Sequence, residues 1–156
     1  MIVEISSNEL ALLRQKITPL GLRLEEDVEL APPAVLEMLA ALAAKVEKQF
    51  YPPAWMLVEK GEIVGLMSIT RLPAIGEIHI GYGVGPMRQG RGNATRAVAD
   101  LLVWAREDRR VRHVSAETGI ENIASQRVLE RNGFMRIGER TDPEDGRLIC
   151  WKIETA

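Results

Sequence analysis

A glycine- and arginine-rich stretch, IGYGVGPMRQGRGNAT at residues 80–95, constrains the fold more than any other part of the sequence. Apolar, β-rich residues precede it and a helical apolar repeat follows it, so it connects a strand to a helix. Glycines let the backbone expose convergent N–H groups and let a ligand approach closely. The first turn of the helix adds unpaired N–H donors and the positive end of the helix dipole. The stretch is therefore predicted to bind phosphate groups, with Arg88 and Arg91 adding charge.

Two familiar phosphate-binding patterns fit this stretch poorly. A P-loop needs Gly-x-x-x-x-Gly-Lys-Ser/Thr, but Gly85 and Gly90 are followed by Arg91-Gly92. A dinucleotide fingerprint starting at Gly90 would need Gly or Ala at position 95, where Thr95 stands. A meander of strands also precedes the loop, in place of a βαβ unit. A nucleotide-binding domain is therefore the weakest of the alternatives.

A third pattern fits. Gln89, Gly92 and Ala94 satisfy the Gln/Arg-x-x-Gly-x-Gly/Ala motif, and the loop resembles the acyl-CoA-binding loop of GNAT N-acetyltransferases. The run Asn-Ile-Ala-Ser at residues 122–125, followed by Gly-Phe at residues 133–134, resembles the second signature of that family. The residues around both motifs look most like the RimJ/RimL-like branch of ribosomal-protein N-terminal acetyltransferases. The resemblance covers residues 55–153, and residues before about 30 do not match that branch clearly.

The resemblance implies a mixed α/β fold with a central, mostly antiparallel twisted sheet flanked by helices, in one domain over residues 1–156. It implies direct transfer of an acetyl group from acetyl-CoA to a primary amine through a tetrahedral intermediate, without a metal. Protein N-termini, polyamines, aminoglycosides and amino acids all present such an amine, and the sequence does not choose between them. Homodimers are common in the family, and the sequence neither favours nor opposes one. A non-catalytic acyl-CoA-binding sensor or docking module with the same fold is the alternative.

The family's cofactor contacts can be carried over by position. The loop would hold the pyrophosphate, and the pantetheine arm would lie along the preceding strand, whose N–H groups would also stabilise the oxyanion. The residues assigned to acetyl-CoA in this way are Tyr82, Gly83, Val84, Arg88, Gln89, Gly90, Arg91, Gly92, Asn93, Ala94, Thr95, Asn122 and Ser125.

The resemblance also suggests which residue protonates the departing thiolate. Many family members use a tyrosine in the helix before Gly-Phe, but that position is Leu129 here. The RimJ/RimL-like branch offers a serine, which matches Ser125. A helix N-terminal serine can equally serve as a backbone cap. Tyr82 is the weaker candidate, because the two-residue period of a strand places it opposite His79.

The amine must lose a proton before it attacks, and a base with a pKa near neutrality is best suited to take it. Glu77 and His79 share one face of the strand before the loop, and His79 has an unperturbed pKa near 6.5. His79 stands where the RimJ/RimL-like branch often carries a glutamate. Glu117 on the next expected strand is a further candidate. The alternative is that His79 only satisfies a hydrogen bond on the sheet face.

The periodicity of apolar residues outlines the remaining elements. Helices are expected from Ser7 or Asn8 to about residue 16, and over residues 32–50, 93–107 and 123–132. Strands are expected over residues 1–5, 55–59, 63–70, 77–84, 111–118, 134–141 and 148–153, with residues 20–24 extended.

Composition narrows the class of protein. A net charge of -2 argues against binding to nucleic acid through the whole surface. Arginines nevertheless outnumber acids seven to three over residues 85–113. The single cysteine, Cys150, excludes an intramolecular disulfide framework and a Cys-based zinc site. The sequence has no membrane-spanning run and no signal-peptide pattern, so a cytoplasmic protein without a membrane partner is expected.

Overall fold

The computed structural model describes residues 1–26 and 28–156. Within them, seven strands form one sheet in the order β1-β2-β3-β4-β5-β7-β6. The strands are β1 (Ile2–Ile5), β2 (Ala54–Glu59), β3 (Glu62–Ala74), β4 (Glu77–Val84), β5 (His113–Gly119), β6 (Met135–Asp142) and β7 (Gly146–Glu154). The helices are α1 (Ser7–Leu13), α2 (Pro33–Glu47), α3 (Asn93–Glu107) and α4 (Ile123–Arg131), with a 3₁₀ turn at Pro86–Arg88. Neighbouring strands are antiparallel except for β4 and β5, which are parallel. The expected fold class is confirmed.

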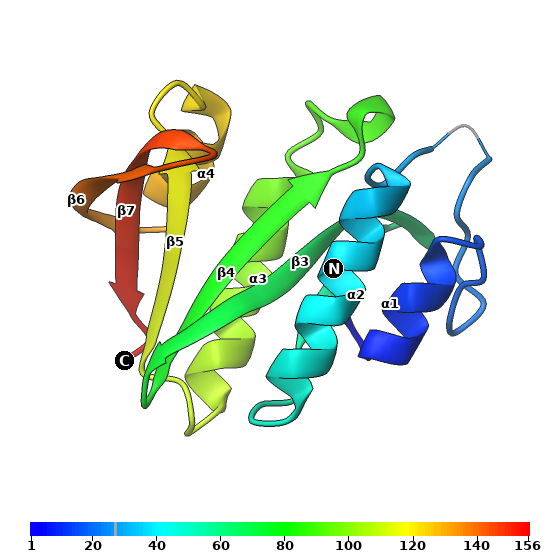
Figure 1. The fold of residues 1–156 in the computed structure, drawn as a ribbon, viewed down its shortest axis with the longest axis horizontal. Helices are drawn as coiled ribbons and strands as arrows, with labels where there is room; N and C mark the ends of the chain where they lie inside the picture. Colours follow the sequence, from blue (N-terminus) through cyan, green and yellow to red (C-terminus); the bar gives the residue numbers. More distant parts are fainter. Residues whose placement is uncertain (27) are drawn as a thin grey trace.

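The helices cover the two faces of the sheet unequally. In Figure 1, α1 and α2 lie in front of the β2–β3 side of the sheet, and α3 and α4 lie behind it. One buried cluster joins α1 and α2 to β1, β2 and β3, and includes Leu10, Leu36 and Met56. A second cluster joins α3 and α4 to most of the sheet, and includes Trp55, Leu101 and Leu129. In the described part of the chain, no helix therefore covers the front face of β5, of β7 and of the first half of β4 (Figure 1).

The later elements follow the apolar pattern closely. Even-numbered residues of β4 and β5, such as Ile78, Ile80 and Val114, pack against α3 and α4. Odd-numbered residues of the same strands are consequently directed to the open face. The expected elements at residues 77–84 and 93–107 are confirmed to the residue, and Gly133 ends α4 with φ +85° as expected for a C′ glycine.

In the first 31 residues, the strand expected at residues 1–5 is present as β1, but the next two expected elements differ from the structure. Helix α1 is capped by Ser6, not by Ser7 or Asn8, because Ser6 and Glu9 form a reciprocal capping box. The helix also ends at Leu13, earlier than expected. Residues 20–24 are not an extended piece: Leu20 and Gly21 both have positive φ in a turn, and only Arg23 forms a single bridge, to Glu62.

No helix among the described residues is long and apolar enough to cross a membrane.

Candidate active site

The candidate site begins where two neighbouring strands separate. β4 and β5 pair from Glu77 opposite His113 to Ile80 opposite Ala116, and their pairing stops there. β4 continues to Val84 along β3, so the two parallel strands form a V that opens toward their C-terminal ends (Figure 1). Ligands of α/β proteins commonly bind at the C-terminal ends of parallel strands.

A cavity of about 490 Å³ lies at this opening, between β4, the glycine-rich loop and α4. Its volume is in the range of small-molecule sites. Of the residues assigned to acetyl-CoA from the sequence, all except Arg91 line it. The structure thus brings together Tyr82, Gly83, Val84, Arg88, Gln89, Gly90, Gly92, Asn93, Ala94, Thr95, Asn122 and Ser125.

The backbone of the loop is suited to an anion. Gly90 and Gly92 have φ of +80° and +76°, a conformation that costs least for glycine. Gly92 is the N-cap of α3, and no side chain caps this helix. The N–H groups of the first turn of α3 are therefore directed toward the cavity without a side-chain partner, at the positive end of the helix dipole.

The polar side chains of the loop hold it against the β2–β3 hairpin. The Arg88 guanidinium binds the Glu62 carboxylate with both arms, at 2.8 Å from Nε to Oε1 and 3.0 Å from Nη2 to Oε2. The hydrogen bond from Arg88 holds the pKa of Glu62 below its usual value. Arg91 and Asn93 lie 3.5 and 3.2 Å from the Glu59 carboxylate. These contacts fix the position of the glycine-rich loop relative to the β2–β3 hairpin.

Helix α4 contributes four cavity residues that were not assigned to acetyl-CoA from the sequence: Ala124, Arg127, Val128 and Arg131. They recur at helical spacing, so they share one face of α4. That spacing, continued from Ala124, is the signal that could have found them. Arg127 and Arg131 are one turn apart and bring positive charge to the wall opposite the loop.

Ser125 lies in the same cavity, at the start of α4. Its Oγ is 3.0 Å from the Tyr82 hydroxyl, which links α4 to β4. The Asn122 side chain, not that of Ser125, caps the helix, because Asn122 Oδ1 accepts from the Ser125 N–H at 3.1 Å. Burial raises the pKa of Tyr82, so this hydroxyl keeps its proton at neutral pH. Leu129 is fully buried in the core.

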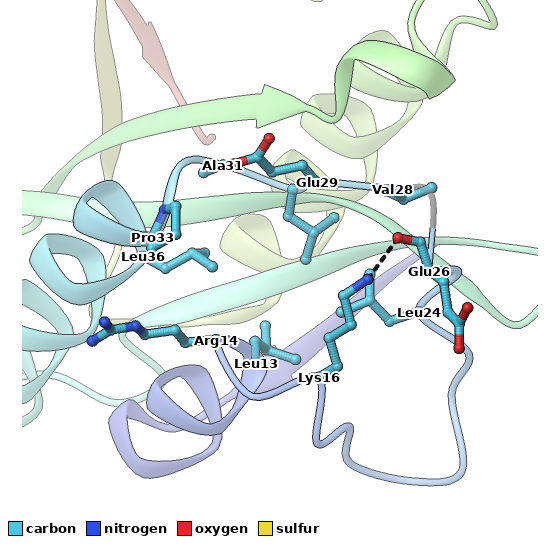
Figure 2. A pocket seen from close by; sticks show the side chains of 11 residues that line it. Leu13, Arg14, Lys16, Leu24, Glu26, Val28, Glu29, Ala31, Pro33 and Leu36 are labelled. Carbon is cyan, nitrogen blue, oxygen red and sulfur yellow. Dashed lines mark hydrogen bonds between the residues drawn. The ribbon is translucent and has the colours of Figure 1, made fainter.

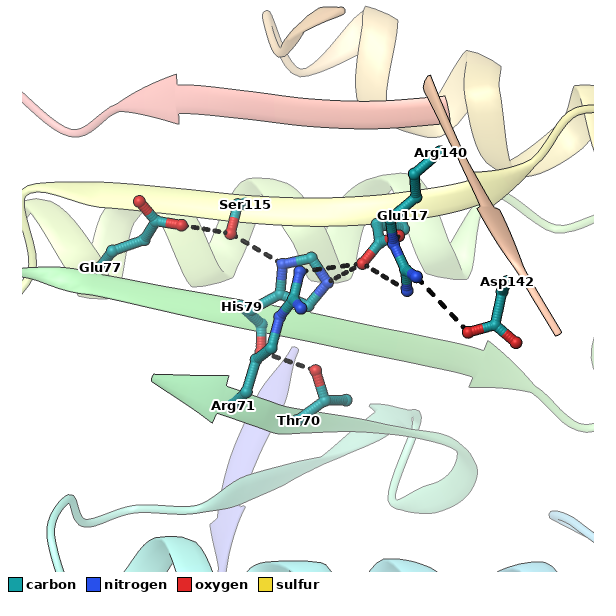
Figure 3. A network of polar contacts seen from close by, with 8 residues as sticks. All are labelled: Thr70, Arg71, Glu77, His79, Ser115, Glu117, Arg140 and Asp142. Carbon is teal, nitrogen blue, oxygen red and sulfur yellow. Dashed lines mark hydrogen bonds and ion pairs between the residues drawn. The ribbon is translucent and has the colours of Figure 1, made fainter. Parts of the chain in front are cut away.

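The candidate bases form a separate polar network on the open face of the sheet. Figure 3 shows His79 between two acidic groups. His79 Nε2 lies 3.2 Å from Glu117 Oε1, and His79 Nδ1 lies 2.8 Å from Ser115 Oγ. Ser115 Oγ in turn donates to Glu77 Oε2 at 2.9 Å. The sequence indicated His79, Glu77 and Glu117 as candidates but not Ser115. The two-residue period of β5, which places Ser115 on the same face as Glu117, is the signal that could have found it.

Two arginines cover this network from neighbouring strands. Arg71 of β3 donates to Glu117 Oε1 at 3.0 Å, and Arg140 of β6 also binds the Glu117 carboxylate. His79 is 7% exposed as a result. Burial and then the charge of Arg71 lower the pKa of His79 from 6.5 to about 4. The expectation that His79 keeps its ordinary pKa is therefore wrong, because the open sheet face is closed by these side chains.

None of Glu77, His79 and Glu117 lines the cavity beside the glycine-rich loop, to which the sequence assigns the cofactor. A smaller hollow of about 260 Å³ lies between the two sites and is lined by apolar residues of α2, by Ser68 and by Gly81, Tyr82 and Gly83. It shares Tyr82 and Gly83 with the cofactor cavity. His79 and Gly81 are alternate residues on one face of β4, about 7 Å apart along the strand.

Figure 2 shows a third hollow, of about 370 Å³, between α1 and the chain that leads into α2. Lys16 crosses one side of it and donates to the Glu26 carbonyl at 2.8 Å. Leu30 and Ala31 line both this hollow and the smaller one beside Gly81. The three hollows therefore follow one another from the glycine-rich loop to the N-terminal part of the chain.

The described residues contain no group of three or more His, Cys, Asp or Glu that could hold a metal ion. Cys150 lies opposite Glu117 on β7, and burial raises the pKa of its thiol. The thiol is therefore a poor nucleophile at neutral pH.

A mixed sheet that opens between two parallel strands, beside a glycine-rich loop and an uncapped helix start, places the protein in the class of acyl-CoA N-acyltransferase folds. The family described as acetyltransferase (GNAT) domain matches residues 23–135, which is most of the chain. The chain belongs to this GNAT acetyltransferase family.

Curated relatives carry acetyltransferase names. The chain is 29% identical over 87 residues to the putative ribosomal N-acetyltransferase YdaF of Bacillus subtilis, a match over 55% of this chain and 48% of the relative. It is 26% identical over 89 residues to the ribosomal-protein-serine acetyltransferase of Escherichia coli, over 56% of this chain and 50% of the relative. These matches thus span about half the length of the curated relatives.

Solved structures share the fold. The RimL ribosomal L7/L12 alpha-N-protein acetyltransferase in complex with coenzyme A has a TM-score of 0.74 at 15% identity, and the alignment covers 98% of this chain and 92% of that one. The aminoglycoside acetyltransferase AAC(6')-Ib in complex with coenzyme A has a TM-score of 0.67 at 17% identity, covering 99% and 94%. At these identities the likeness concerns the fold alone.

Proposed function

We propose that the protein transfers the acetyl group of acetyl-CoA to a primary amine. The observation that carries this proposal is the cavity where β4 and β5 separate, because it joins an uncapped helix start to the Ser125–Tyr82 hydroxyl pair. The first can hold phosphates and the second can donate a proton. Acetyl-CoA supplies an activated thioester, and its leaving group, the CoA thiolate, must be protonated.

The two ends of the cavity have different tasks. The N–H groups at the start of α3 would hold the pyrophosphate, and Arg127 and Arg131 would add charge from α4. Backbone N–H groups of residues 81–84, beyond the point where β4 leaves β5, would hold the pantetheine arm and polarise the reacting carbonyl. The Ser125 hydroxyl would donate its proton to the departing sulfur, and the Tyr82 hydroxyl would then donate a hydrogen bond to Ser125 Oγ.

The amine would enter from the other side of β4. The apolar hollow beside Gly81 and Gly83 places an acceptor next to the cofactor cavity, and His79 lies two residues further along the same strand face. His79 would take the proton of the ammonium group and Glu117 would stabilise the resulting imidazolium. Because the pKa of His79 is about 4, the imidazole is in its basic form at neutral pH but accepts a proton only weakly.

For the acceptor, we propose the amino terminus of a protein. The names of two relatives support this choice, since one is a ribosomal-protein-serine acetyltransferase and the other a putative ribosomal N-acetyltransferase. The succession of hollows toward the N-terminal part of the chain also suits an extended acceptor better than a compact one.

Release of free thiol from acetyl-CoA tests the proposal, measured with a panel of short peptides, a polyamine, an aminoglycoside and free amino acids. We expect thiol release that depends on a peptide with a free amino terminus and stops when that terminus is blocked. Tight acetyl-CoA binding without thiol release for any amine would favour the alternative, a sensor or docking module. The burial of His79 is the observation that favours this second function.

A further inference from the structure

Ser115 holds a central place in the polar network of the open sheet face. It is 5% exposed, and its one hydroxyl lies between His79 Nδ1 and Glu77 Oε2 (Figure 3). A hydroxyl has a single proton to donate. The direction in which Ser115 donates therefore determines which nitrogen of His79 carries a proton.

Glu77 fixes that direction. Its other oxygen, Oε1, lies 2.7 Å from the Lys152 ammonium, and the hydrogen bonds from Lys152 and Ser115 hold the pKa of Glu77 below its usual value despite burial. An ionised carboxylate can only accept hydrogen bonds. The Ser115 proton must therefore be directed to Glu77.

With its proton directed to Glu77, Ser115 can only accept from His79. The single proton of the neutral imidazole is then expected on Nδ1, because its contact with Ser115 is the shorter one, at 2.8 Å against 3.2 Å for Nε2, and Glu117 already accepts from Arg71 and Arg140. Nε2 then keeps a lone pair. This Nε2 atom faces Glu117 Oε1 at 3.2 Å, and neither atom has a proton for that contact while the imidazole is neutral. A second proton, bound to Nε2, would give each contact in the series Lys152–Glu77–Ser115–His79–Glu117 a hydrogen to donate.

We propose that Ser115 is a positioning residue: with Glu77 it holds His79 as the Nδ1–H tautomer, so that Nε2 is the atom that accepts the proton of the amine. In this step an ammonium N–H bond breaks, an Nε2–H bond forms, and the electron pair stays on the amine nitrogen. The imidazolium is then paired with Glu117. The functional meaning rests on the proposed role of His79 as base, whereas the tautomer can be measured without any reaction.

The other charged groups around His79 are compatible with this assignment. Arg71 of β3 and Arg140 of β6 are directed to Glu117, and Asp142 lies 3.5 Å from Arg140. Cys150 of β7 faces the same side of the sheet, with a thiol pKa that burial raises. Among the described groups, therefore, only Ser115 has a hydrogen bond to Nδ1.

Nitrogen-15 NMR of the imidazoles tests the proposal, because the chain has only two histidines, His79 and His113. Spectra of the full chain in a His113→Asn background report His79 alone. At pH 7 we expect a protonated Nδ1 and an unprotonated Nε2. In Glu77→Gln the amide would turn its oxygen to Lys152 and its NH₂ to Ser115, so that Ser115 donates to Nδ1. We therefore expect Glu77→Gln to convert His79 to the Nε2–H tautomer, and Ser115→Ala to do the same, because Glu117 is then the remaining described hydrogen-bond partner of the imidazole and can only accept.

The matched control is Glu154→Gln, since Glu154 lies 3.7 Å from the other histidine, His113. This control should leave the His79 spectrum unchanged. A dominant Nε2–H tautomer in the unmutated site would overturn the proposal, and so would the same tautomer in Glu77→Gln as in the parent. If Glu77→Gln changes the tautomer as expected, the kcat of this variant should fall about 100-fold or more, with its KM for acetyl-CoA unchanged. A changed tautomer with an unchanged kcat would confirm the hydrogen-bond assignment and contradict the role of His79 as base.

Discussion

The Tyr82 hydroxyl lies 3.0 Å from Ser125 Oγ, and this contact joins β4 to the start of α4 at the cavity beside the glycine-rich loop. The two residues are 43 positions apart in the chain. The contact places a protonated phenol behind the serine hydroxyl, because burial raises the pKa of Tyr82. A donor chain of two hydroxyls is therefore present where the family resemblance implies a single proton donor.

Removing either hydroxyl should lower turnover without weakening cofactor binding. Ser125→Ala is expected to reduce kcat by about 10²-fold, the lower end of what a general acid contributes. Tyr82→Phe should cost less, since Ser125 keeps its own proton. Single-turnover kinetics and acetyl-CoA titrations on the same samples separate the two effects. A kcat that stays at the wild-type value in Ser125→Ala from pH 6 to pH 9 would remove Ser125 from the mechanism.

The buried His79 should make stability depend on pH. Its folded pKa of about 4 lies below the usual value of 6.5, so between these values the unfolded chain binds more protons than the folded one. Stability is then fully present above about pH 6.5 and is lost as the pH falls toward 4, by up to about 3 kcal/mol for this group. Urea unfolding of the wild type and of His79→Gln at several pH values measures the difference. Parallel pH profiles for the two proteins between pH 6.5 and 4.5 would show that His79 is not buried in neutral form.

Glu62 should support the cofactor loop without touching the cofactor cavity. It binds Arg88 with both carboxylate oxygens, and both side chains are largely buried. Glu62→Ala would leave Arg88 without this partner and should lower the free energy of unfolding by about 1–3 kcal/mol. Acetyl-CoA affinity should fall with it, because the loop loses its attachment to the hairpin. Equal affinity in calorimetry for Glu62→Ala and wild type would mean that the loop keeps its shape without this ion pair.

The arginines of α4 should contribute to affinity through phosphate. Arg127→Gln and Arg131→Gln are each expected to weaken acetyl-CoA about 10-fold, as for the loss of one charge-assisted hydrogen bond. The effect should shrink at high salt. Arg106→Gln, at an exposed position of α3 outside the cavity, is the matched control. If the control weakens binding as much as the two variants, the effect is one of net charge and not of position.

The sequence was informative where apolar periodicity and a local motif act together. The helix from Asn93 and the strand up to Val84 could be placed to the residue, because a glycine-rich turn separates a period of 2 from a period of 3.6. The bounds of α1 and the turn at Leu20 could not, because a capping box at Ser6 and a left-handed turn are local conformations that many sequences allow.

The polar network was only partly accessible to sequence reasoning. The strand period placed Glu77 and His79 on one face, but Ser115 and Arg140 reach them from strands that are distant in the chain. The lowered pKa of His79 follows first from burial and then from the charge of Arg71, which β3 brings opposite His79. The partners and the pKa of His79 follow from tertiary contacts, which no local pattern in the sequence predicts.

Calorimetric titration of acetyl-CoA into Gly92→Glu tests the central claim most directly. The substitution places a negative charge and a strained backbone, at φ +76°, in the N–H cradle at the start of α3. Gly138→Glu is the matched control, since Gly138 lies in the exposed strand β6 and an added Cβ there would meet no atom within 4 Å. We predict that Gly138→Glu binds acetyl-CoA like the wild type and that Gly92→Glu shows no measurable binding while remaining folded. Unchanged affinity in folded Gly92→Glu would contradict the assignment of this cavity to acetyl-CoA.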